Sequence, residues 1–207
     1  MRFDIYKSAQ KISMLFDQVP KQKLDQLAVE LKIDLKVFSA TASTREPDAK
    51  GLDEKLSVVL AALEREGQIG TADQPRSYFR GELPMIWGDL NLPSNAEDES
   101  SWIPRSIIFC GKTTNGTAIA LVGSHRYLIG SDASQTATAF YIKPSTAFRI
   151  AAALESDIDP SDNIYLEGLI EPQWHESPVQ QNLEFVAKTF LNLDGKIIGS
   201  PLYVALK

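Results

Sequence analysis

The sequence predicts an α+β fold with a mostly antiparallel sheet, which can close into a barrel, flanked by three to four helices. Short β-rich runs and amphipathic helical runs are intermixed without the regular alternation that builds a parallel α/β sheet. An Asn115-Gly116 pair between two β-rich runs is typical of a hairpin turn. The chain has 207 residues, of which 43% are hydrophobic and 23% charged, so we expect one domain over residues 1–207.

The N-terminal third combines an opening strand with helical stretches. Phe3 and Ile5 alternate with polar neighbours, which predicts a short strand at the start of the chain. Apolar residues at helical spacing predict three helices, over residues 12–19, 21–32 and 54–67. Between the second and third helices, residues 35–38 are expected to form a strand and residues 39–51 a loop.

The central part is rich in β-forming residues. Residues 69–76 are predicted to be a connection, and residues 77–90 one or two strands that are bent or bulged by internal glycine and proline. Residues 91–101 are polar and acidic, which indicates a mobile loop. Three apolar runs then predict a β meander: residues 106–110, 117–122 and 127–129.

The C-terminal part mixes both types of structure. Strands are expected over four short runs: residues 140–142, 164–170, 196–198 and 202–206. Helices are expected over residues 146–155 and 179–191. In the latter, apolar residues recur at helical spacing from Leu183 to Phe190, and Pro178 suits a first helical turn.

The composition excludes several classes of function. A net charge of −6 gives no long-range attraction to phosphate backbones, so we expect no generic nucleic-acid binding. No apolar run reaches the roughly 20 residues of a membrane span, and we expect no membrane partner and a cytoplasmic location. The single cysteine, Cys110, cannot form an intramolecular disulfide, and its apolar surroundings indicate a small buried hydrophobe.

Motifs of established chemistry are incomplete. Cys110-Gly111-Lys112-Thr113 lacks the upstream glycine of a phosphate-binding loop, so a hairpin turn is the better interpretation. Gly123-Ser124-His125 lacks the Gly-x-Ser-x-Gly elbow of a nucleophilic serine, although either side chain could contact a ligand. His125 and His175 show no diagnostic metal-binding spacing. We therefore predict no metal and no cofactor.

Cationic and aromatic residues near the ends of the central strands instead indicate binding. Guanidinium groups bind carboxylate or phosphate through two hydrogen bonds, and aromatic rings can stack on a base. The predicted ligand-binding residues are Tyr78, Arg80, Lys112, Ser124, His125, Arg126 and Tyr127. We expect Arg80 and the turn at 124–127 to share a surface. The alternative is that the arginines pair with local acids such as Glu82 and Asp89 while the aromatic residues fill the sheet core.

Four segments together carry a resemblance to a known family: SMLFDQVP at 13–20, YFRGEL at 78–83, GSHRYLIG at 123–130 and GSPLYVAL at 199–206. The chain resembles a family of uncharacterised bacterial proteins found in defence or conflict gene neighbourhoods, with caspase-like and repeat-containing partners. The resemblance implies a small intracellular accessory or sensor module. It supplies no catalytic residues.

The function that we expect from the sequence is ligand sensing or partner binding in such a system. The ligand would be a small anionic, nucleotide-like molecule, and the partner another protein. One alternative is a hydrolase or nuclease that uses His125 or His175 with a carboxylate. Another is a structural interaction subunit with exposed aromatic residues such as Trp102 and Trp174.

Overall fold

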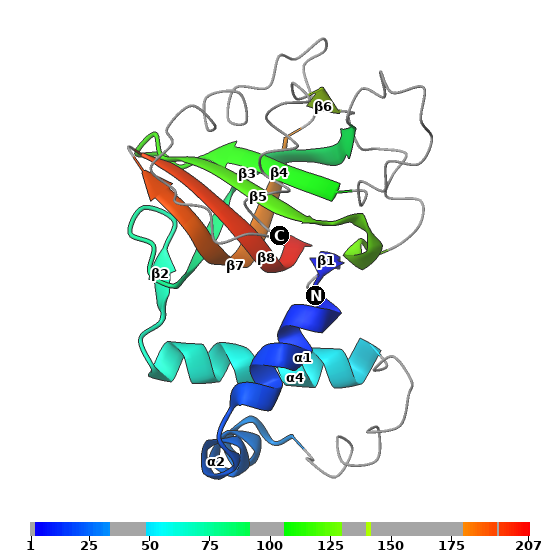
Figure 1. Ribbon diagram of the computed structural model, residues 1–207, viewed down its shortest axis with the longest axis vertical. Coiled ribbons are helices and arrows are strands. Elements are labelled where there is room, and N and C mark those ends of the chain that lie inside the picture. Colours follow the sequence, from blue (N-terminus) through cyan, green and yellow to red (C-terminus); the bar gives the residue numbers. More distant parts are fainter. Residues whose placement is uncertain (1–2, 34–48, 92–105, 130–139, 142–179, 194) are drawn as a thin grey trace, which may run out of the picture.

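The computed structural model describes residues 3–33, 49–91, 106–129, 140–141, 180–193 and 195–207. The helices in this part of the chain are α1 (Ala9–Gln18), α2 (Lys21–Leu31), α4 (Ala49–Arg65) and the short 3-10 helix η1 (His125–Tyr127). The strands are β1 (Phe3–Lys7), β2 (Ile69–Thr71), β3 (Tyr78–Asn91), β4 (Ser106–Lys112), β5 (Ala118–Ser124), β6 (Phe140–Tyr141), β7 (Gln181–Leu193) and β8 (Lys196–Leu206). Figure 1 shows the barrel strands on one side and the three α-helices on the other.

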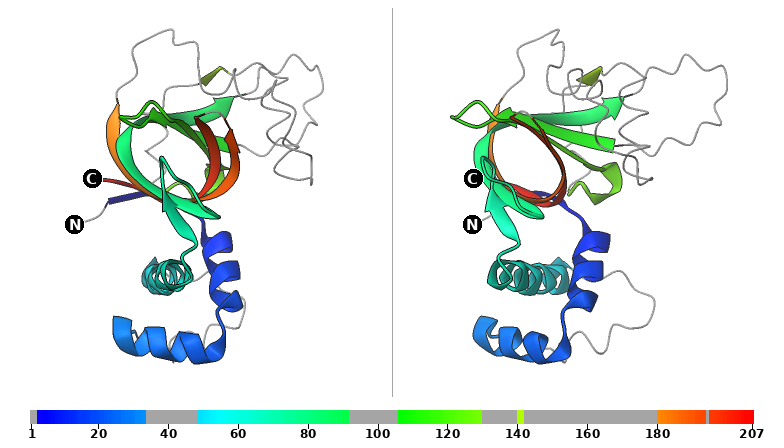
Figure 2. Two further views of the ribbon diagram at one scale, coloured as in Figure 1. Left: turned by 90° about the vertical axis from the view of Figure 1, so that its left-hand side faces the viewer. Right: turned by 60° about the vertical axis from the view of Figure 1, so that its left-hand side comes forward.

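Five strands close into a barrel in the order β3, β4, β5, β8, β7 and back to β3. Closure depends on the length of β3, whose residues 78–85 pair with β7 while residues 85–90 pair with β4. Within the ring, β5 and β8 are parallel and the other neighbours are antiparallel. This is the Greek-key order of an OB-fold barrel. Figure 2 shows the closed ring from its end.

Three further strands extend the barrel. β1 adds to the free edge of β8 in antiparallel orientation, and Tyr6 of β1 forms a bridge with Leu128, just beyond η1. β2 and β6 each pair in parallel with β3. The bridge between Tyr6 and Leu128 fastens the turn after β5 to β1.

The barrel interior is apolar. Side chains from every strand of the ring meet there, among them Phe79, Phe109 and Phe185. Tyr6 closes one side of this core and lies across Gly123, where an added Cβ would come within 2.5 Å of the Tyr6 hydroxyl oxygen. A glycine is therefore required on β5 at this point, since any larger residue would displace the tyrosine.

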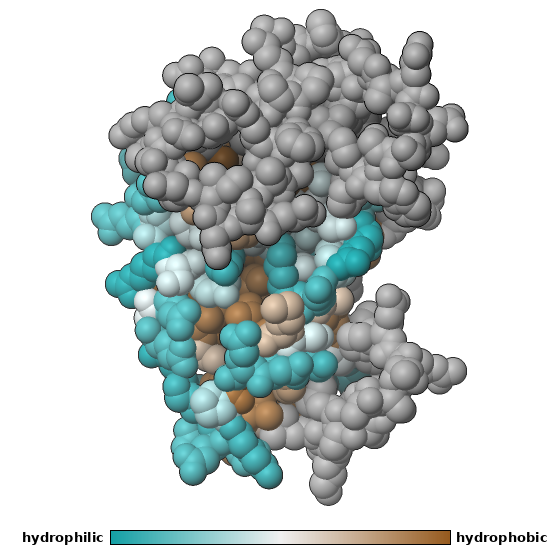
Figure 3. Space-filling model, in the orientation of Figure 1, coloured by the Kyte–Doolittle hydropathy of each residue, from teal (hydrophilic) through white to brown (hydrophobic). Residues whose placement is uncertain are grey.

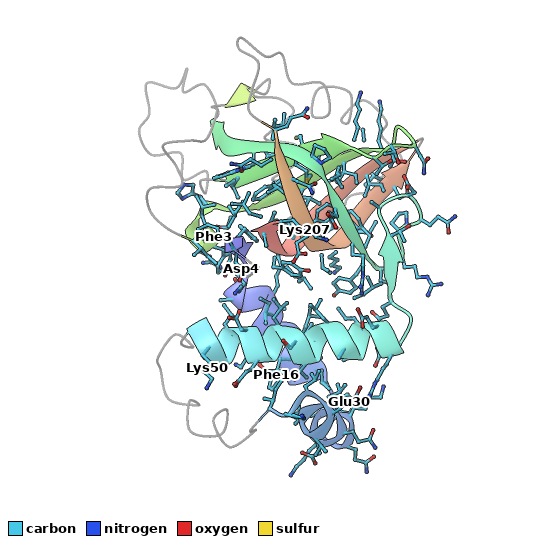
Figure 4. The ribbon with its side chains drawn as sticks, turned by 180° about the vertical axis from the view of Figure 1, so that it is seen from behind. Phe3, Asp4, Phe16, Glu30, Lys50 and Lys207 are labelled. Atoms are coloured by element: carbon cyan, nitrogen blue, oxygen red, sulfur yellow. The ribbon has the colours of Figure 1, made fainter. Side chains whose placement is uncertain are left out.

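The helices form a second core against the outside of the barrel. Apolar faces of α1, α2 and α4 pack on Val186 of β7 and Leu202 of β8. Figure 4 labels Phe16, where α1 crosses α4, and Asp4 on β1. The ammonium of buried Lys7 pairs with Asp4 and with Asp53 of α4, which ties the barrel to the helices. Figure 3 shows hydrophobic surface where the barrel meets the helices, bordered by hydrophilic residues.

The predicted fold class is confirmed, because a mixed but mainly antiparallel barrel carries three α-helices in the described part of the chain. The opening strand and the three N-terminal helices lie where the hydrophobic spacing places them, and the third begins earlier than predicted, at Ala49. The hairpin between β4 and β5 is confirmed as well. Gly116 has a φ of +87°, the positive angle for which the Asn-Gly pair is suited.

The predicted helix over residues 179–191 is wrong, because residues 181–193 form β7. Leu183, Phe185 and Ala187 alternate into the barrel interior, which is the period of a strand. Val186, on the opposite face, is also apolar because the helices cover that side. Burial on both faces therefore gave this strand an apolar spacing that resembles a helix.

Smaller differences concern the ends and neighbours of strands. Residues 196–206 form one continuous strand through Pro201. Of the one or two strands predicted over residues 77–90, the structure has one, β3, over residues 78–91. Residues 69–71, predicted as a connection, form β2. The third piece of the predicted meander is replaced by η1, and β5 takes β8 as its second neighbour. Three predicted segments lie wholly outside the described residues: the strands at 35–38 and 164–170 and the helix at 146–155. The loop predicted at 91–101 lies outside them too, apart from Asn91, which ends β3. The loop predicted at 39–51 lies outside them up to residue 48, and residues 49–51 begin α4.

Candidate functional site

The predicted binding residues occupy three separate places on the barrel. Tyr78 and Arg80 lie at the start of β3, beside α4. Lys112 ends β4, at the hairpin that leads to β5. Ser124 ends β5, and residues 125–127 form the η1 turn beside α1. The geometry therefore separates the seven residues and keeps the Ser124–Tyr127 group together.

Arg80 is engaged with a carboxylate. Its guanidinium pairs with Glu64 near the C-terminal end of α4, and both side chains are about half exposed. This matches the simpler expectation that an arginine pairs with a nearby acid, although the acid comes from α4 rather than from β3. Tyr78 is buried against the helices, and burial raises the pKa of its hydroxyl. Neither side chain is presented as a free binding group.

Lys112 lies beside a turn that is fixed by hydrogen bonds. The Thr113 hydroxyl donates to Asp73 at 2.6 Å, and the Asn115 amide donates to the other oxygen of that carboxylate at 2.9 Å. These hydrogen bonds lower the pKa of Asp73, the one from Thr113 most. The segment is thus a β hairpin, and no helix follows it as a phosphate-binding loop would require.

The η1 turn carries a network of three side chains. Arg126 Nη2 donates to the Gln10 side-chain oxygen in the first turn of α1, and also to the Tyr127 hydroxyl. The Tyr127 hydroxyl donates to the same Gln10 oxygen at 3.0 Å. The guanidinium carbon lies 4.6 Å from the centre of the Tyr127 ring, which is cation–π geometry. Arg126 is therefore held in place although it is exposed.

Edge-on contacts between aromatic rings connect this network to the core of the barrel. The Tyr127 ring meets Tyr6 edge-on at 6.2 Å between centroids, and Tyr6 meets Phe109 of the barrel core in the same way at 6.0 Å. Burial raises the pKa of Tyr6 to about 12. The hydroxyls of Tyr6 and Ser8 are fully buried. The turn thus rests on the core of the barrel, which limits its movement.

The charge of Arg126 distinguishes this site from the one around Arg80. Its hydrogen-bond acceptors in the described part of the chain, Gln10 and Tyr127, are both neutral. Both hydrogen bonds leave from Nη2, and Nη1 and Nε donate to none of the described residues. An ordered guanidinium with neutral neighbours and spare donors can bind a carboxylate or phosphate through two parallel hydrogen bonds.

The outer face of β4 and β5 offers no comparable chemistry. In OB-fold barrels the second and third strands of the ring present the surface that binds oligonucleotides. Here, Ile107, Phe109, Ile119 and Leu121 point into the barrel core. The alternating residues on the outer side are apolar and buried too: Ile108, Cys110, Ala120 and Val122. Stacking rings and cations are thus missing from the described middle of these two strands.

The structure also bears on the predictions for Cys110, for a metal site and for a membrane span. Cys110 is buried, and burial raises the pKa of its thiol to about 12, which confirms the interpretation as a small hydrophobe. Within the described ranges, no three His, Cys, Asp or Glu side chains gather closely enough to hold a metal ion. None of the described helices is both long and apolar enough to cross a membrane. Trp102, Trp174 and His175 lie outside the described residues.

The sequence did not indicate Gln10, whose side-chain oxygen accepts a hydrogen bond from Arg126 of the turn. The residue stands on the exposed side of an amphipathic helix, where glutamine carries no functional signal of its own. The contact arises because β1 adds to the sheet beside η1, and this brings the start of α1 to the turn.

Comparison with known proteins gives one match. A model described as a family of unknown function, DUF7019, matches residues 2–207. No curated protein and no solved structure is similar to the chain.

Proposed function

Since this chain belongs to the family of unknown function DUF7019, whose description names no activity, we propose a function from the geometry: it binds a small anionic ligand at the η1 turn. Arg126 supplies the charge, and Gln10 and Tyr127 hold its guanidinium in position. The phosphate group of a nucleotide-like molecule fits this chemistry. The proposed site is smaller than the set of binding residues expected from the sequence, because it does not include Arg80 or Lys112.

The observation that supports this proposal most strongly is a pre-oriented cation whose hydrogen-bond acceptors among the described residues are neutral. Ordering an arginine side chain for a ligand normally costs conformational entropy, up to about 2 kcal/mol for a long side chain. At Arg126 the fold has already met part of that cost, through two hydrogen bonds and the contact with the Tyr127 ring. Binding of an anion then costs less conformational entropy, so more of the ion-pairing free energy appears in the binding affinity.

The size of the ligand follows from the surroundings. Long single strands need a groove with several stacking platforms and cations. The described part of the β4–β5 face is buried and apolar, and the net charge of the chain is −6. A ligand that brings one or two anionic groups to a single arginine is therefore favoured over an oligonucleotide.

The test is thermal denaturation with AMP, ATP and cyclic di-AMP, each at constant ionic strength. A ligand present at 100 times its Kd should raise the melting temperature by about 5 °C or more. Arg126→Ala should weaken binding about tenfold or more, because the charge-assisted hydrogen bonds are lost. Arg126→Lys, which keeps the charge but loses the planar fork, should fall between the two proteins.

Arg80→Ala is the matched control. It also removes an exposed arginine from the barrel surface, but one that already pairs with Glu64. Its ligand-induced shift should equal that of the wild-type chain. If none of the three nucleotides stabilises the wild-type chain, or if Arg80→Ala weakens binding as much as Arg126→Ala does, the proposed site is wrong.

We further propose, from the sequence resemblance alone, that this binding serves a sensing or accessory role in a bacterial defence system. Reconstitution with proteins from neighbouring genes would test that role, since a bound nucleotide should alter the association. The hydrolase alternative gains no specific support from the geometry. The described contacts of the turn position a cation, whereas hydrolysis would require a proton-transfer pair.

A further inference from the structure

Two lysines and a buried serine gather between α1 and the β7–β8 strand pair, away from the η1 turn. Lys188 and Ser200 are directly paired across β7 and β8, so their side chains leave the same face of the sheet. Lys11 reaches this face from α1. Its ammonium donates to the Ser200 hydroxyl, and to the Pro201 carbonyl oxygen at 3.3 Å.

This cluster has no acidic partner in the described part of the chain. Lys188 is exposed and forms no ion pair there, and the acceptors of Lys11 are both neutral. Burial, and then repulsion from Lys188, lower the pKa of Lys11 to about 8. Ser200 is 4% exposed. Two ammonium groups that repel each other beside a buried hydroxyl are a source of electrostatic strain, which an anion between them would relieve.

Other described lysines have their charge compensated by a carboxylate. Lys7 pairs with Asp4 and Asp53, Lys23 with Glu66, and Lys207 with Glu82. Lys11 is more buried than Lys23 or Lys207, so its charge is more expensive to leave uncompensated. Among the described residues, the Lys11 cluster has neutral hydrogen-bond acceptors in place of such a carboxylate.

We propose that Lys11, Lys188 and Ser200 form a second anion site, which takes an oxyanion of the phosphate type. The two ammonium groups neutralise the charge, and the Ser200 hydroxyl donates to one oxygen once Lys11 turns toward the anion. The site lies on a different side of α1 from Arg126, and its existence does not depend on the function proposed above.

The test follows the side-chain signals of ¹³C-labelled lysines by NMR during a titration with inorganic phosphate. Chloride keeps the ionic strength constant. The Cε signals of Lys11 and Lys188 should shift with saturation, and the pKa of Lys11 should rise above its phosphate-free value, because a bound anion stabilises the ammonium. A parallel titration with glycerol 3-phosphate separates the two sources of the anion. Tighter binding of the ester indicates an organic phosphate, and equal or weaker binding indicates free phosphate.

Lys188→Ala is the main variant, since it changes an exposed strand residue and should leave the fold intact. It should weaken phosphate binding about tenfold. Lys23→Ala, which removes a lysine that pairs with Glu66, should leave the affinity unchanged. The proposal is overturned if phosphate and its ester shift the lysine signals no more than chloride does, or if Lys188→Ala binds phosphate as tightly as the wild-type chain.

Discussion

The interior of the barrel and its interface with the helices are built from the same strands but differ in chemistry. Inside the barrel, the described core consists of aliphatic and aromatic side chains from all five strands of the ring. At the interface, an apolar core is accompanied by Lys7, Lys11, Ser8 and Ser200, which are buried or half-buried. The strands thus turn an apolar face inward and a partly polar face toward α1.

This difference indicates where function can reside. The described side chains that fill the closed five-stranded ring are mainly aliphatic and aromatic, so they offer few polar groups to recognise a ligand. The start of α1, by contrast, meets η1 through Gln10 and β8 through Lys11. We infer that the barrel provides stability, while binding depends on the polar groups beside α1.

The largest effect should come from the barrel interior. Phe185→Ala removes a buried ring that packs edge-on against Phe79 at 5.6 Å between centroids. We expect a loss of about 3–5 kcal/mol in the free energy of unfolding, measured by chemical denaturation. Phe190→Ala, on the same strand but 43% exposed, should cost less than about 1 kcal/mol. Similar losses for the two variants would contradict the assignment of the core.

A pH-dependent effect should come from the interface. In the folded chain the pKa of Lys11 is about 8, below its usual value of 10.5, so the folded state binds fewer protons between these values. The contribution of Lys11 to stability must therefore rise as the pH increases from about 8 to 10.5. Lys11 faces charged Lys188 of β7. The described hydrogen-bond acceptors of the Lys11 ammonium, the Ser200 hydroxyl and the Pro201 carbonyl oxygen, are neutral.

Lys11→Met isolates this contribution. The burial of Tyr6 and Cys110 alters stability at high pH in both proteins, so the comparison must be between the two unfolding curves at each pH. The advantage of Lys11→Met over the wild-type chain should be greatest near pH 7 and should shrink as the pH rises through 8 to 10.5. A constant difference over this range would mean that Lys11 titrates normally.

The smallest effect should come from the exposed pair at the far end of α4. Arg80→Ala breaks an ion pair whose side chains are both about half exposed. Solvent screening limits such pairs to about 0–1 kcal/mol, so the free energy of unfolding should change by no more than that. A loss comparable to that of Phe185→Ala would show that Arg80 anchors α4 to the barrel.

The sequence predicted those elements whose signals are local. The β4–β5 hairpin followed from Asn115-Gly116, and the N-terminal helices from their apolar stripes. The error at β7 has a tertiary origin, because Val186 is apolar only through contact with the helices. The η1 turn was recognised by its composition, whereas its contacts with Gln10 and Tyr6 depend on the pairing of β1 with β8 and Leu128. The cluster of Lys11, Lys188 and Ser200 joins residues from opposite ends of the chain, so no local pattern could have indicated it.

The most direct test of the account is a backbone amide NMR titration of the chain with AMP and ATP. If binding depends on the polar groups beside α1, the largest shifts should fall on the first turn of α1 and on η1, at Gln10, Arg126 and Tyr127. Signals from the β4–β5 hairpin around Asn115 and from the strand around Arg80 should remain unchanged. Shifts that centre on the hairpin or on Arg80, with none at η1, would contradict the central claim.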